Sequence, residues 1–418
     1  MLRFMRWCVV VMVVCGAASV RAADFFFKDG DVVVMIGDSI TEQHLYSNYV
    51  EMWTITRFPK WKLTFRNVGI GGDRSTGGNS RFTRDVLLHK PTAMTVDFGM
   101  NDAGSGDAGL KAFIDGLQGM ANQAKAANIR VAWATPQPLD NAEQGPTALT
   151  GYNVMLEKYS LGVKDIAAKN SGLFVDQFHP YLAALDRARG KSPKYDRITA
   201  GDAVHPGPPG QALMAASILK GLNFPTLVSS AEIDAGSGKV VSMKNCTVET
   251  VVKKDGGVSF SRLDAALPFF PAEAASILPH EQILDELNDY RLKVTGLAAG
   301  RYEVRVGGKK VAELTAELLA GGLNIAAGVL ADGPIADQAK AVKAAVEAKN
   351  RLHHDMIFRG IVLSNVPEWV YSVVPREELE AKKTAIIQER LAKLPALDAE
   401  VAKSLAMKAN SFDIVPVK

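Results

Sequence analysis

The sequence predicts an α/β fold: a doubly wound parallel sheet followed by a β-rich module and a helical C-terminal region. In residues 23–224, short runs rich in β-branched residues alternate with segments of helical periodicity, which is typical of a parallel sheet covered on both faces. Residues 225–330 are rich in Gly, Val and Thr and alternate between apolar and polar residues, as in antiparallel strands joined by tight turns. Residues 331–418 are charged and helical in pattern. A chain of 418 residues is long enough for these three parts.

The parallel sheet is expected to contain five strands, each a short apolar run: residues 31–36, 63–68, 93–98, 129–134 and 173–175. Helices are expected at residues 109–127, 147–169 and 207–222. Five such strands suit a flavodoxin-like layout, in which ligands bind beyond the carboxyl ends of the strands. Gly-rich or polar loops follow the expected strands at those ends. In the β-rich module, residues 291–295 and 302–306 are expected to be antiparallel strands.

The first 22 residues have the pattern of a signal peptide. Arg3 and Arg6 form a basic start, residues 8–18 are apolar or small, and small residues precede a cut ahead of Ala23. Spanning a bilayer takes about 20 apolar residues, more than this stretch provides. We therefore expect a protein exported to the periplasm or secreted, without stable membrane insertion after cleavage. An uncleaved anchor is the alternative.

Charge and cysteine content narrow the range of partners. Removal of the three arginines in the signal leaves 45 basic and 45 acidic residues, so no nucleic-acid or anionic-membrane partner is expected. Cys8 and Cys15 leave with the signal, and Cys246 then has no cysteine to pair with. Cys246 is expected to be an apolar filler, with a reactive thiol as the alternative.

A serine stands directly after the first expected strand, in Gly37-Asp38-Ser39-Ile40-Thr41. A serine after a strand and a glycine turn lies at the carboxyl edge of the sheet with its hydroxyl exposed. The helix that follows directs its first N–H groups toward developing negative charge there. A plain helix cap is the alternative. The chain contains no Gly-x-Ser-x-Gly motif, which excludes the nucleophile elbow of α/β-hydrolases.

A histidine with an aspartate three residues earlier occurs in Asp202-Ala-Val-His205-Pro-Gly, just before the last expected helix. This spacing can place a carboxylate on one ring nitrogen and leave the other as a general base. An ordinary turn is the alternative. Asp176, near His179 at the end of the fifth strand, is a competing acid, although the three-residue spacing favours Asp202.

Two further loops offer donors for an oxyanion. The glycines of residues 69–72 permit close backbone approach, and Asn101 supplies a side-chain amide at the end of the third strand. The competing interpretation of the glycine loop is a nucleotide-binding turn, which would need a glycine where Arg74 stands. Asn101 and Asp102 could otherwise be ordinary turn residues.

Together these motifs resemble the four blocks of the SGNH (GDSL-like) hydrolase family: Gly37-Asp38-Ser39, Asn67-x-Gly69-x-x-Gly72-Asp73, Gly99-x-Asn101-Asp102 and Asp202-x-x-His205. The resemblance covers residues 28–222, about half of the chain. It implies the SGNH fold, with Ser39 as nucleophile, His205 as base and Asp202 as the residue that orients the base. It also implies an oxyanion hole formed by the backbone of Ser39, the backbone of Gly72 and the side chain of Asn101, and no metal or organic cofactor.

The resemblance implies a serine esterase that hydrolyses carboxylic esters through an acyl-enzyme. Members of the family include esterases, lipases, thioesterases and carbohydrate deacetylases. No long apolar lid precedes the site, and export together with a loop-rich β module favours a glycan ester, such as an acetylated sugar. A lysophospholipase or thioesterase acting on a small-molecule ester is one alternative. A non-catalytic carbohydrate-binding protein that uses the same crevice is another, against which the intact Ser39, Asn101 and His205 argue.

Other histidines are expected to lie outside the site. Adjacent side chains on a helix point about 100° apart, so His353 and His354 are not expected to bind one metal ion without ligands from elsewhere. His44 is expected at a solvated helix position, with the mouth of the site as the alternative.

Overall fold

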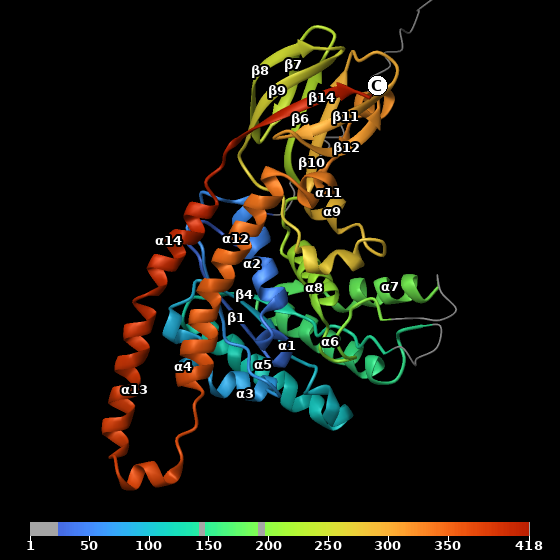
Figure 1. Cartoon of the computed structure of the whole chain (residues 1–418). Helices are drawn as coiled ribbons and strands as arrows, with labels where there is room; N and C mark the ends of the chain where they lie inside the picture. The colour runs from blue at the N-terminus through green and yellow to red at the C-terminus, as the bar shows by residue number, and fades with distance from the viewer. Residues whose placement is uncertain (1–23, 142–146, 191–196, 418) are drawn as a thin grey trace, which may run out of the picture.

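The computed structural model describes residues 24–141, 147–190 and 197–417, and Figure 1 shows their arrangement. The predicted signal peptide lies outside the described residues. An α/β domain forms one end of the molecule and a β module the other, with a helical tail along one side. Within the described residues, no helix is both long and apolar enough to cross a membrane.

The α/β domain is built on a parallel sheet with the strand order β2-β1-β3-β4-β5. The strands are β1 (Val32–Gly37), β2 (Thr64–Asn67), β3 (Ala93–Asp97), β4 (Arg130–Ala134) and β5 (Leu173–Val175). All neighbouring pairs are parallel. Every residue of β3 is buried, as expected for a central strand with helices on both faces. The predicted doubly wound, flavodoxin-like fold class is confirmed.

The helices of this domain are α1 (Ser39–Glu42), α2 (Leu45–Arg57), α3 (Ser75–Ser80), α4 (Phe82–Asp85), α5 (Gly106–Ala126), α6 (Tyr152–Lys169), α7 (Phe178–Arg189) and α8 (Pro208–Gly221). Helix α8 begins with two prolines after Gly207, where the missing N–H groups cost nothing because they lack intrahelical partners. Almost every residue of α2 and α8 is buried, because other helices cover them on the outside.

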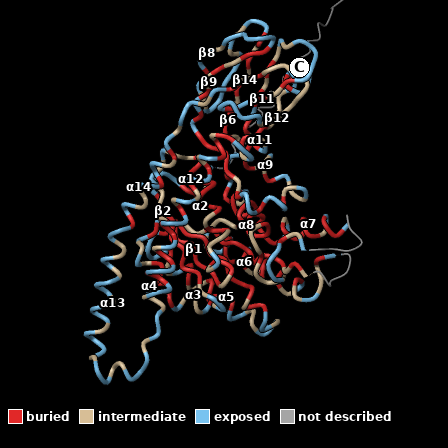
Figure 2. Tube along the Cα trace, viewed as in Figure 1, coloured by how far each residue is buried: buried red, intermediate tan, exposed pale blue. Residues whose placement is uncertain are grey.

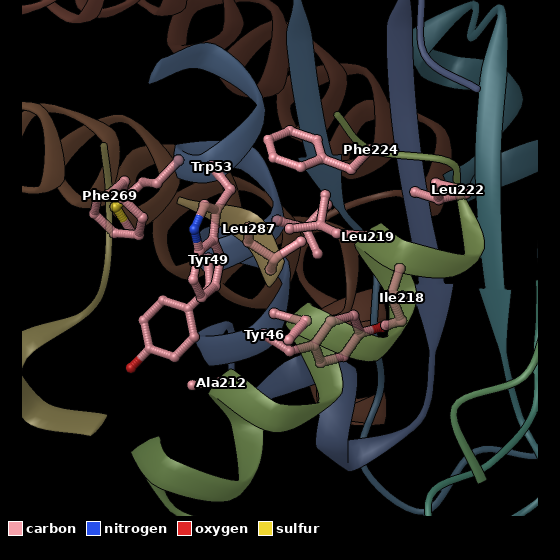
Figure 3. Packing of buried hydrophobic residues seen from close by; sticks show 14 of the residues in the cluster. Tyr46, Tyr49, Trp53, Ala212, Ile218, Leu219, Leu222, Phe224, Phe269 and Leu287 are labelled. Atoms are coloured by element: carbon pink, nitrogen blue, oxygen red, sulfur yellow. The ribbon is translucent and has the colours of Figure 1, made fainter. Parts of the chain in front are cut away.

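The core continues from the α/β domain into the segment that follows β9. Figure 3 shows Trp53 of α2 beside Phe269, with Leu219 and Phe224 nearby. The rings of Trp53 and Phe269 meet edge to face, with centroids 5.5 Å apart. Both side chains are fully buried, so the two parts of the chain share one apolar core at this contact.

The β module contains two sheets within the described residues. One has the order β13-β10-β6-β7, and the other has the order β12-β11-β14-β9-β8. Their strands are β6 (Leu227–Asp234), β7 (Lys239–Lys244), β8 (Cys246–Lys254), β9 (Gly257–Asp264), β10 (Asp289–Thr295), β11 (Arg301–Val306), β12 (Lys309–Thr315), β13 (Leu323–Asn324) and β14 (Ala409–Pro416).

The predicted pairing of β10 is wrong in part. β10 runs parallel to β6 and antiparallel to β13, whereas β11 belongs to the other sheet and pairs with β12 and β14. Alternation of apolar and polar residues identified both strands but cannot determine which neighbour each one takes. Buried Arg262 of β9 connects the sheets: its guanidinium donates to Ser229 Oγ on β6 (2.6 Å) and lies over the ring of Tyr290 on β10.

Residues 334–404, here called the helical tail, follow the β module. They form α12 (Pro334–Arg351), the π-helix η4 (Leu352–Val362), the 3₁₀ turn η5 (Glu368–Ser372), α13 (Arg376–Leu391) and α14 (Leu394–Ser404). Shorter helices precede them: α9 (Ile283–Leu287), α10 (Ala316–Gly321) and α11 (Ala326–Ala331). α12 lies beside α2, whereas α13 extends away from the domain and has no buried residue (Figures 1 and 2).

The expectation that the chain is helical to its end is wrong for Ala409–Pro416. This segment is β14, which inserts between β9 and β11. Phe412 and Ile414 are buried and alternate with more exposed residues, as in a strand. The alternating segment is short, so the long charged helices before it dominate the sequence pattern.

Candidate active site

Ser39 is held at the end of β1 by a turn that only glycine fits. A Cβ on Gly37 would lie 2.0 Å from Thr41 Oγ1 and 2.6 Å from the carbonyl oxygen of Asp97. Asp38 caps α1, since its Oδ1 accepts the N–H of Ile40 at 3.0 Å. Ser39 is therefore the first residue of α1 and lies half-buried at the carboxyl edge of the sheet.

His205 reaches Ser39 across 166 residues of sequence. The Nε2 atom of its ring lies 2.9 Å from Ser39 Oγ, and its Nδ1 atom lies 3.1 Å from Asp202 Oδ2. The other carboxylate oxygen of Asp202 accepts the backbone N–H groups of Val204 (2.8 Å) and His205 (2.6 Å). The structure thus brings together the predicted nucleophile, base and orienting acid.

The loop before α8 is fixed by backbone contacts. Gly201 has φ +67°, and a Cβ there would lie 2.2 Å from the carbonyl oxygen of His205. The N–H of Asp202 donates to that same carbonyl. The hydrogen bond from the backbone N–H of His205 is the largest cause that lowers the pKa of Asp202, with smaller contributions from the His205 ring and the N–H of Val204. Asp202 therefore stays ionised and can hold the ring in one tautomer.

The two predicted oxyanion loops lie against each other. Asn101 Nδ2 donates to the carbonyl oxygen of Asp73 at 2.9 Å, which leaves the second hydrogen of the amide for another acceptor. Gly72 has φ +72°, a conformation that a side chain would strain. Asn67 ties this loop to α1: its Nδ2 donates to Thr41 O (2.6 Å), and its Oδ1 accepts the N–H of Gly69 (2.9 Å).

Arg81 holds the same loop, and its role was not predicted. It is buried, and its guanidinium donates to Asp73 Oδ2 (2.7 Å), to Val68 O (2.6 Å) and to Gly37 O (3.2 Å). These contacts join the ends of β1 and β2 to the glycine loop. A sequence pattern does not indicate this residue, because an arginine between two short helices usually points into solvent.

Three buried carboxyl groups lie beneath the site. Burial raises the pKa of Asp38 to about 7, and the neighbouring Asp102 adds to the effect. Burial also raises the pKa of Asp97, against the hydrogen bond from Gln177 Nε2 (3.0 Å). The pKa of Asp102 is raised by burial as well, against the hydrogen bonds that its carboxylate accepts from the hydroxyl and backbone N–H of Ser75.

The other candidate residues lie elsewhere. Asp176 contacts His179, with 2.7 Å between Oδ2 and Nδ1, and Glu157 contacts the other ring nitrogen of His179. Cys246 is half-buried and donates to Ser230 O, and burial raises the pKa of its thiol, the opposite of what a reactive thiol requires.

His44 does not have the solvated helix position that was expected. It precedes α2 with φ +66°, and its ring packs against that of His354, with centroids 3.7 Å apart. His354 of the helical tail covers the ring of His44, a long-range contact that periodicity within 40–57 cannot reveal.

A parallel sheet that carries Ser39, His205 and Asp202 at its carboxyl edge, beside a glycine loop and Asn101, defines the class of serine hydrolases. Comparison with known proteins agrees. Residues 35–213 match the model of the GDSL-like lipase/acylhydrolase family. The α/β domain belongs to this SGNH (GDSL-like) family, and the protein is a carboxylic ester hydrolase.

Two relatives illustrate the likeness. An acetylxylan esterase from Geobacillus stearothermophilus is 24% identical over 222 residues, which are 47% of this chain and 95% of that protein. The solved structure of a gut microbial diltiazem-metabolizing enzyme has 24% sequence identity and a TM-score of 0.79, and the match covers 94% of this chain and 98% of that one. The likeness to this structure thus extends beyond the α/β domain to the β module and the helical tail.

Proposed function

We propose that the protein is a serine esterase that removes O-acetyl groups from carbohydrates, with Ser39, His205 and Asp202 as its catalytic residues. The observation that carries the proposal is the contact of 2.9 Å between Ser39 Oγ and His205 Nε2, with Asp202 on the other ring nitrogen. This is the arrangement that an activated serine nucleophile requires.

The reaction proceeds in two halves. His205 Nε2 takes the hydroxyl proton as Ser39 Oγ attacks the ester carbonyl carbon, and the tetrahedral intermediate collapses when His205 passes that proton to the leaving alcohol. The acetyl group is then an ester of Ser39. Water attacks this ester, gives its proton to His205, and releases acetate as the proton returns to Ser39.

The oxyanion of each tetrahedral intermediate would be held by three donors. The N–H of Ser39 lies in the first turn of α1, where backbone N–H groups lack intrahelical acceptors. Gly72 supplies a backbone N–H, and Asn101 supplies the amide hydrogen that Asp73 does not use. These groups are fixed before the substrate binds, which is what makes such donors effective.

Two observations support a carbohydrate ester as substrate. The His205 side chain is 37% exposed and that of Asp202 is 65% exposed, so the pair lies at an open surface that admits a bulky alcohol such as a glycan. The relative that matches 47% of this chain is an acetylxylan esterase. An acyl chain of many carbons would instead need an apolar tunnel to bury it.

The proposal is tested on the chain from Ala23 onward. Release of p-nitrophenol from acetate, butyrate and octanoate esters is measured first, and acetate release from acetylated xylo-oligosaccharides second. We expect acetate to be the best acyl group. In Ser39→Ala we expect a loss of about 10⁴-fold or more in kcat. Preference for octanoate would favour the lysophospholipase or thioesterase alternative.

His179 provides a matched control, because it also contacts an aspartate three residues before it. His205→Ala should lose activity as Ser39→Ala does, and His179→Ala should retain it. Equal activity of Ser39→Ala and the wild type, both folded by circular dichroism, would contradict the proposal. Binding of the oligosaccharides without hydrolysis would then support the carbohydrate-binding alternative.

Export to the periplasm or the medium is also proposed, on the pattern of residues 1–22. Cell fractionation followed by mass spectrometry of the N-terminus tests it. We expect the exported protein to begin at Ala23, and a protein that keeps residues 1–22 in the membrane fraction would favour the uncleaved anchor.

A further inference from the structure

A second cluster of polar side chains lies where the helical tail meets the α/β domain. His44 precedes α2, and His354 and Asp355 belong to the π-helix η4, about 310 residues later in the chain. One potential ligand atom from each of these side chains lies within 4.8 Å of the others. The His44 and His354 rings are in edge-to-face contact, and His354 Nδ1 lies 3.0 Å from Asp355 Oδ1.

Three of the four imidazole nitrogens of His44 and His354 have no hydrogen-bond partner among the described residues, and His354 Nδ1 contacts Asp355. Both ring nitrogens of His44 and Nε2 of His354 are buried, and none has a hydrogen bond of normal geometry among the described residues, although the side chain of Asn48 adjoins His44. Buried polar atoms are nearly always satisfied, so an unpartnered nitrogen on each of two rings in contact points to a missing ligand. Packing of hydrophobic surface does not explain them, because an apolar side chain of similar size would fill the same space without the desolvation cost.

The backbone at both ends of the cluster is unusual. His44 has φ +66°, a conformation uncommon for residues other than glycine. His354 and Asp355 lie in a π-helix, which is rare and often marks a functional site. These conformations bring side chains from distant segments to one point, although His353 and His354 themselves diverge and His353 contacts His89 instead.

We propose that His44, His354 and Asp355 bind one divalent transition-metal ion, of which Zn²⁺ is the best match. Two imidazoles and a carboxylate are a ligand set that Zn²⁺ takes in proteins, at about 2.0–2.2 Å from each atom. The candidate atoms now lie within 4.8 Å of one another, so binding requires side-chain rotations that bring them around one ion. The adjacent histidines of η4 were not expected to bind a metal without a ligand from elsewhere in the chain. His44 provides that ligand.

The surroundings permit a cation. A cavity of about 410 Å³ adjoins the cluster, and its walls include Glu42 and Glu347, so further carboxylate or water oxygens are at hand for a fourth ligand. Two arginines, Arg351 and Arg359, also line the cavity, and Glu42 pairs with Arg359 at 3.0 Å. The buried ring nitrogens of His44 and His354 favour the neutral imidazole, which has the lone pair that a metal requires.

The ion would fasten the helical tail to the segment after the nucleophile. His44 follows Ser39 by five residues, and Glu42 between them lies beside the glycine loop, where a Cβ on Gly71 would be 2.8 Å from Glu42 Oε2. The cluster is separate from the hydrogen bonds that join Ser39, His205 and Asp202. Its expected effect is therefore on stability and on the docking of the helical tail, separate from the ester chemistry.

The test begins with the wild-type chain, purified without a polyhistidine tag and treated with a chelator. The chelated protein is incubated with Zn²⁺ and dialysed, and the bound Zn²⁺ is measured by mass spectrometry. In a second sample Co²⁺ is titrated in, and the visible absorption of a four-coordinate site is followed. We expect one ion per chain, and a Tm that rises on saturation with Zn²⁺. Less than 0.1 ion per chain, in protein that is folded by circular dichroism, overturns the proposal.

Variants locate the ion. His354→Gln and His44→Asn each remove one imidazole, and asparagine tolerates the positive φ at residue 44. We expect each to weaken Co²⁺ affinity at least tenfold. His179→Gln is the matched control, because Asp176 and Glu157 contact opposite nitrogens of that ring and so cannot gather on one ion. Loss of the ion in His179→Gln overturns the proposal, and so does retention of the ion in both cluster variants. If either cluster variant fails to fold, the number of ions bound per wild-type chain tests the proposal instead.

Discussion

At the scale of single residues, the candidate site depends on side chains that hold loops as much as on those that react. Asn67 and Arg81 never contact the ester in the proposed reaction, yet they join the glycine loop to the ends of β1 and β2. Such contacts keep Gly72 and Asn101 in place before substrate arrives, and preorganised donors contribute more to catalysis than donors that must move.

Asn101→Ala should lower kcat by about 10²–10³-fold with little change in KM, because the amide contacts charge that develops only in the transition state. Steady-state kinetics with p-nitrophenyl acetate measures the effect. The amide also donates to Asp73 O, so Asn101→Asp, which keeps the size but loses the donor, serves as a second variant. A rise in KM at constant kcat in either variant would show that Asn101 binds the ground state instead.

Asp38→Asn should stabilise the protein at neutral and alkaline pH. The pKa of Asp38 is about 7 in the folded protein and 3.8 without burial. Between those values the folded state holds a proton that the unfolded state has lost, so the free energy of unfolding falls as pH rises through this window. Asparagine does not ionise and is an equally good N-cap.

The Tm difference between this variant and the wild type should therefore be small at pH 4 and reach about 5–10 °C at pH 8. Scanning calorimetry at pH 4, 6 and 8 checks it. A Tm difference that does not depend on pH would mean that Asp38 is ionised in the folded protein from pH 4 to pH 8. Burial would then not raise its pKa.

Several site residues could be predicted from sequence because their signals are local. Ser39, Asn101 and the Asp202–His205 pair each follow a strand or precede a helix at a fixed spacing, and parallel strands bring their carboxyl ends to one edge. His44 and Arg81 could not be predicted, because their partners are a distant helix for one and backbone carbonyls for the other.

At the scale of elements, the helical tail is attached to the α/β domain through polar contacts that are largely buried. Lys349 of α12 pairs with Glu51 of α2, and each side chain is only 2% exposed. Asn350 Nδ2 donates to the other oxygen of Glu51 at 2.8 Å. α13, by contrast, contributes no buried residue and covers no core.

Glu51→Met should destabilise the protein by about 3–5 kcal/mol, because it leaves the Lys349 ammonium buried without a counter-ion. The double variant Glu51→Met/Lys349→Met removes both charges and should be more stable than either single variant. Urea denaturation of the four proteins gives the coupling free energy. Lys382→Met, which breaks an exposed pair in α13, is the control and should change little. If the losses in the free energy of unfolding of the two single variants add up in the double variant, Glu51 and Lys349 are not coupled.

At the scale of the whole molecule, the last strand of the chain returns to the β module that the chain left before the helical tail. It leaves the β module at α12, runs along the α/β domain and back through α13 and α14, and returns as β14. The three-part order of sheet, β module and helices could be predicted because composition changes near residues 225 and 331. The return of β14 could not, because pairing with β9 and β11 depends on strands about 100 to 150 residues away, and no local signal specifies such partners.

Deletion of residues 409–418 should therefore unfold the β module although it removes only the end of the chain. β14 is the middle strand of its sheet, and Phe412 and Ile414 are buried in the core of the module, with Phe412 stacked on Phe260 at 5.3 Å. Without it, the facing edges of β9 and β11 are left unpaired, and exposed edges promote aggregation. We expect the shortened chain to elute as aggregates in size-exclusion chromatography, whereas deletion of residues 417–418 alone should not.

Phe412→Ala tests the same strand without shortening the chain. Loss of its ring should cost about 3–5 kcal/mol in urea denaturation, because the cavity left behind cannot collapse. Ser411→Ala, on the exposed face of β14, is its neighbour and control. If the shortened chain stays monomeric with the Tm of the wild type, the β module is complete without β14.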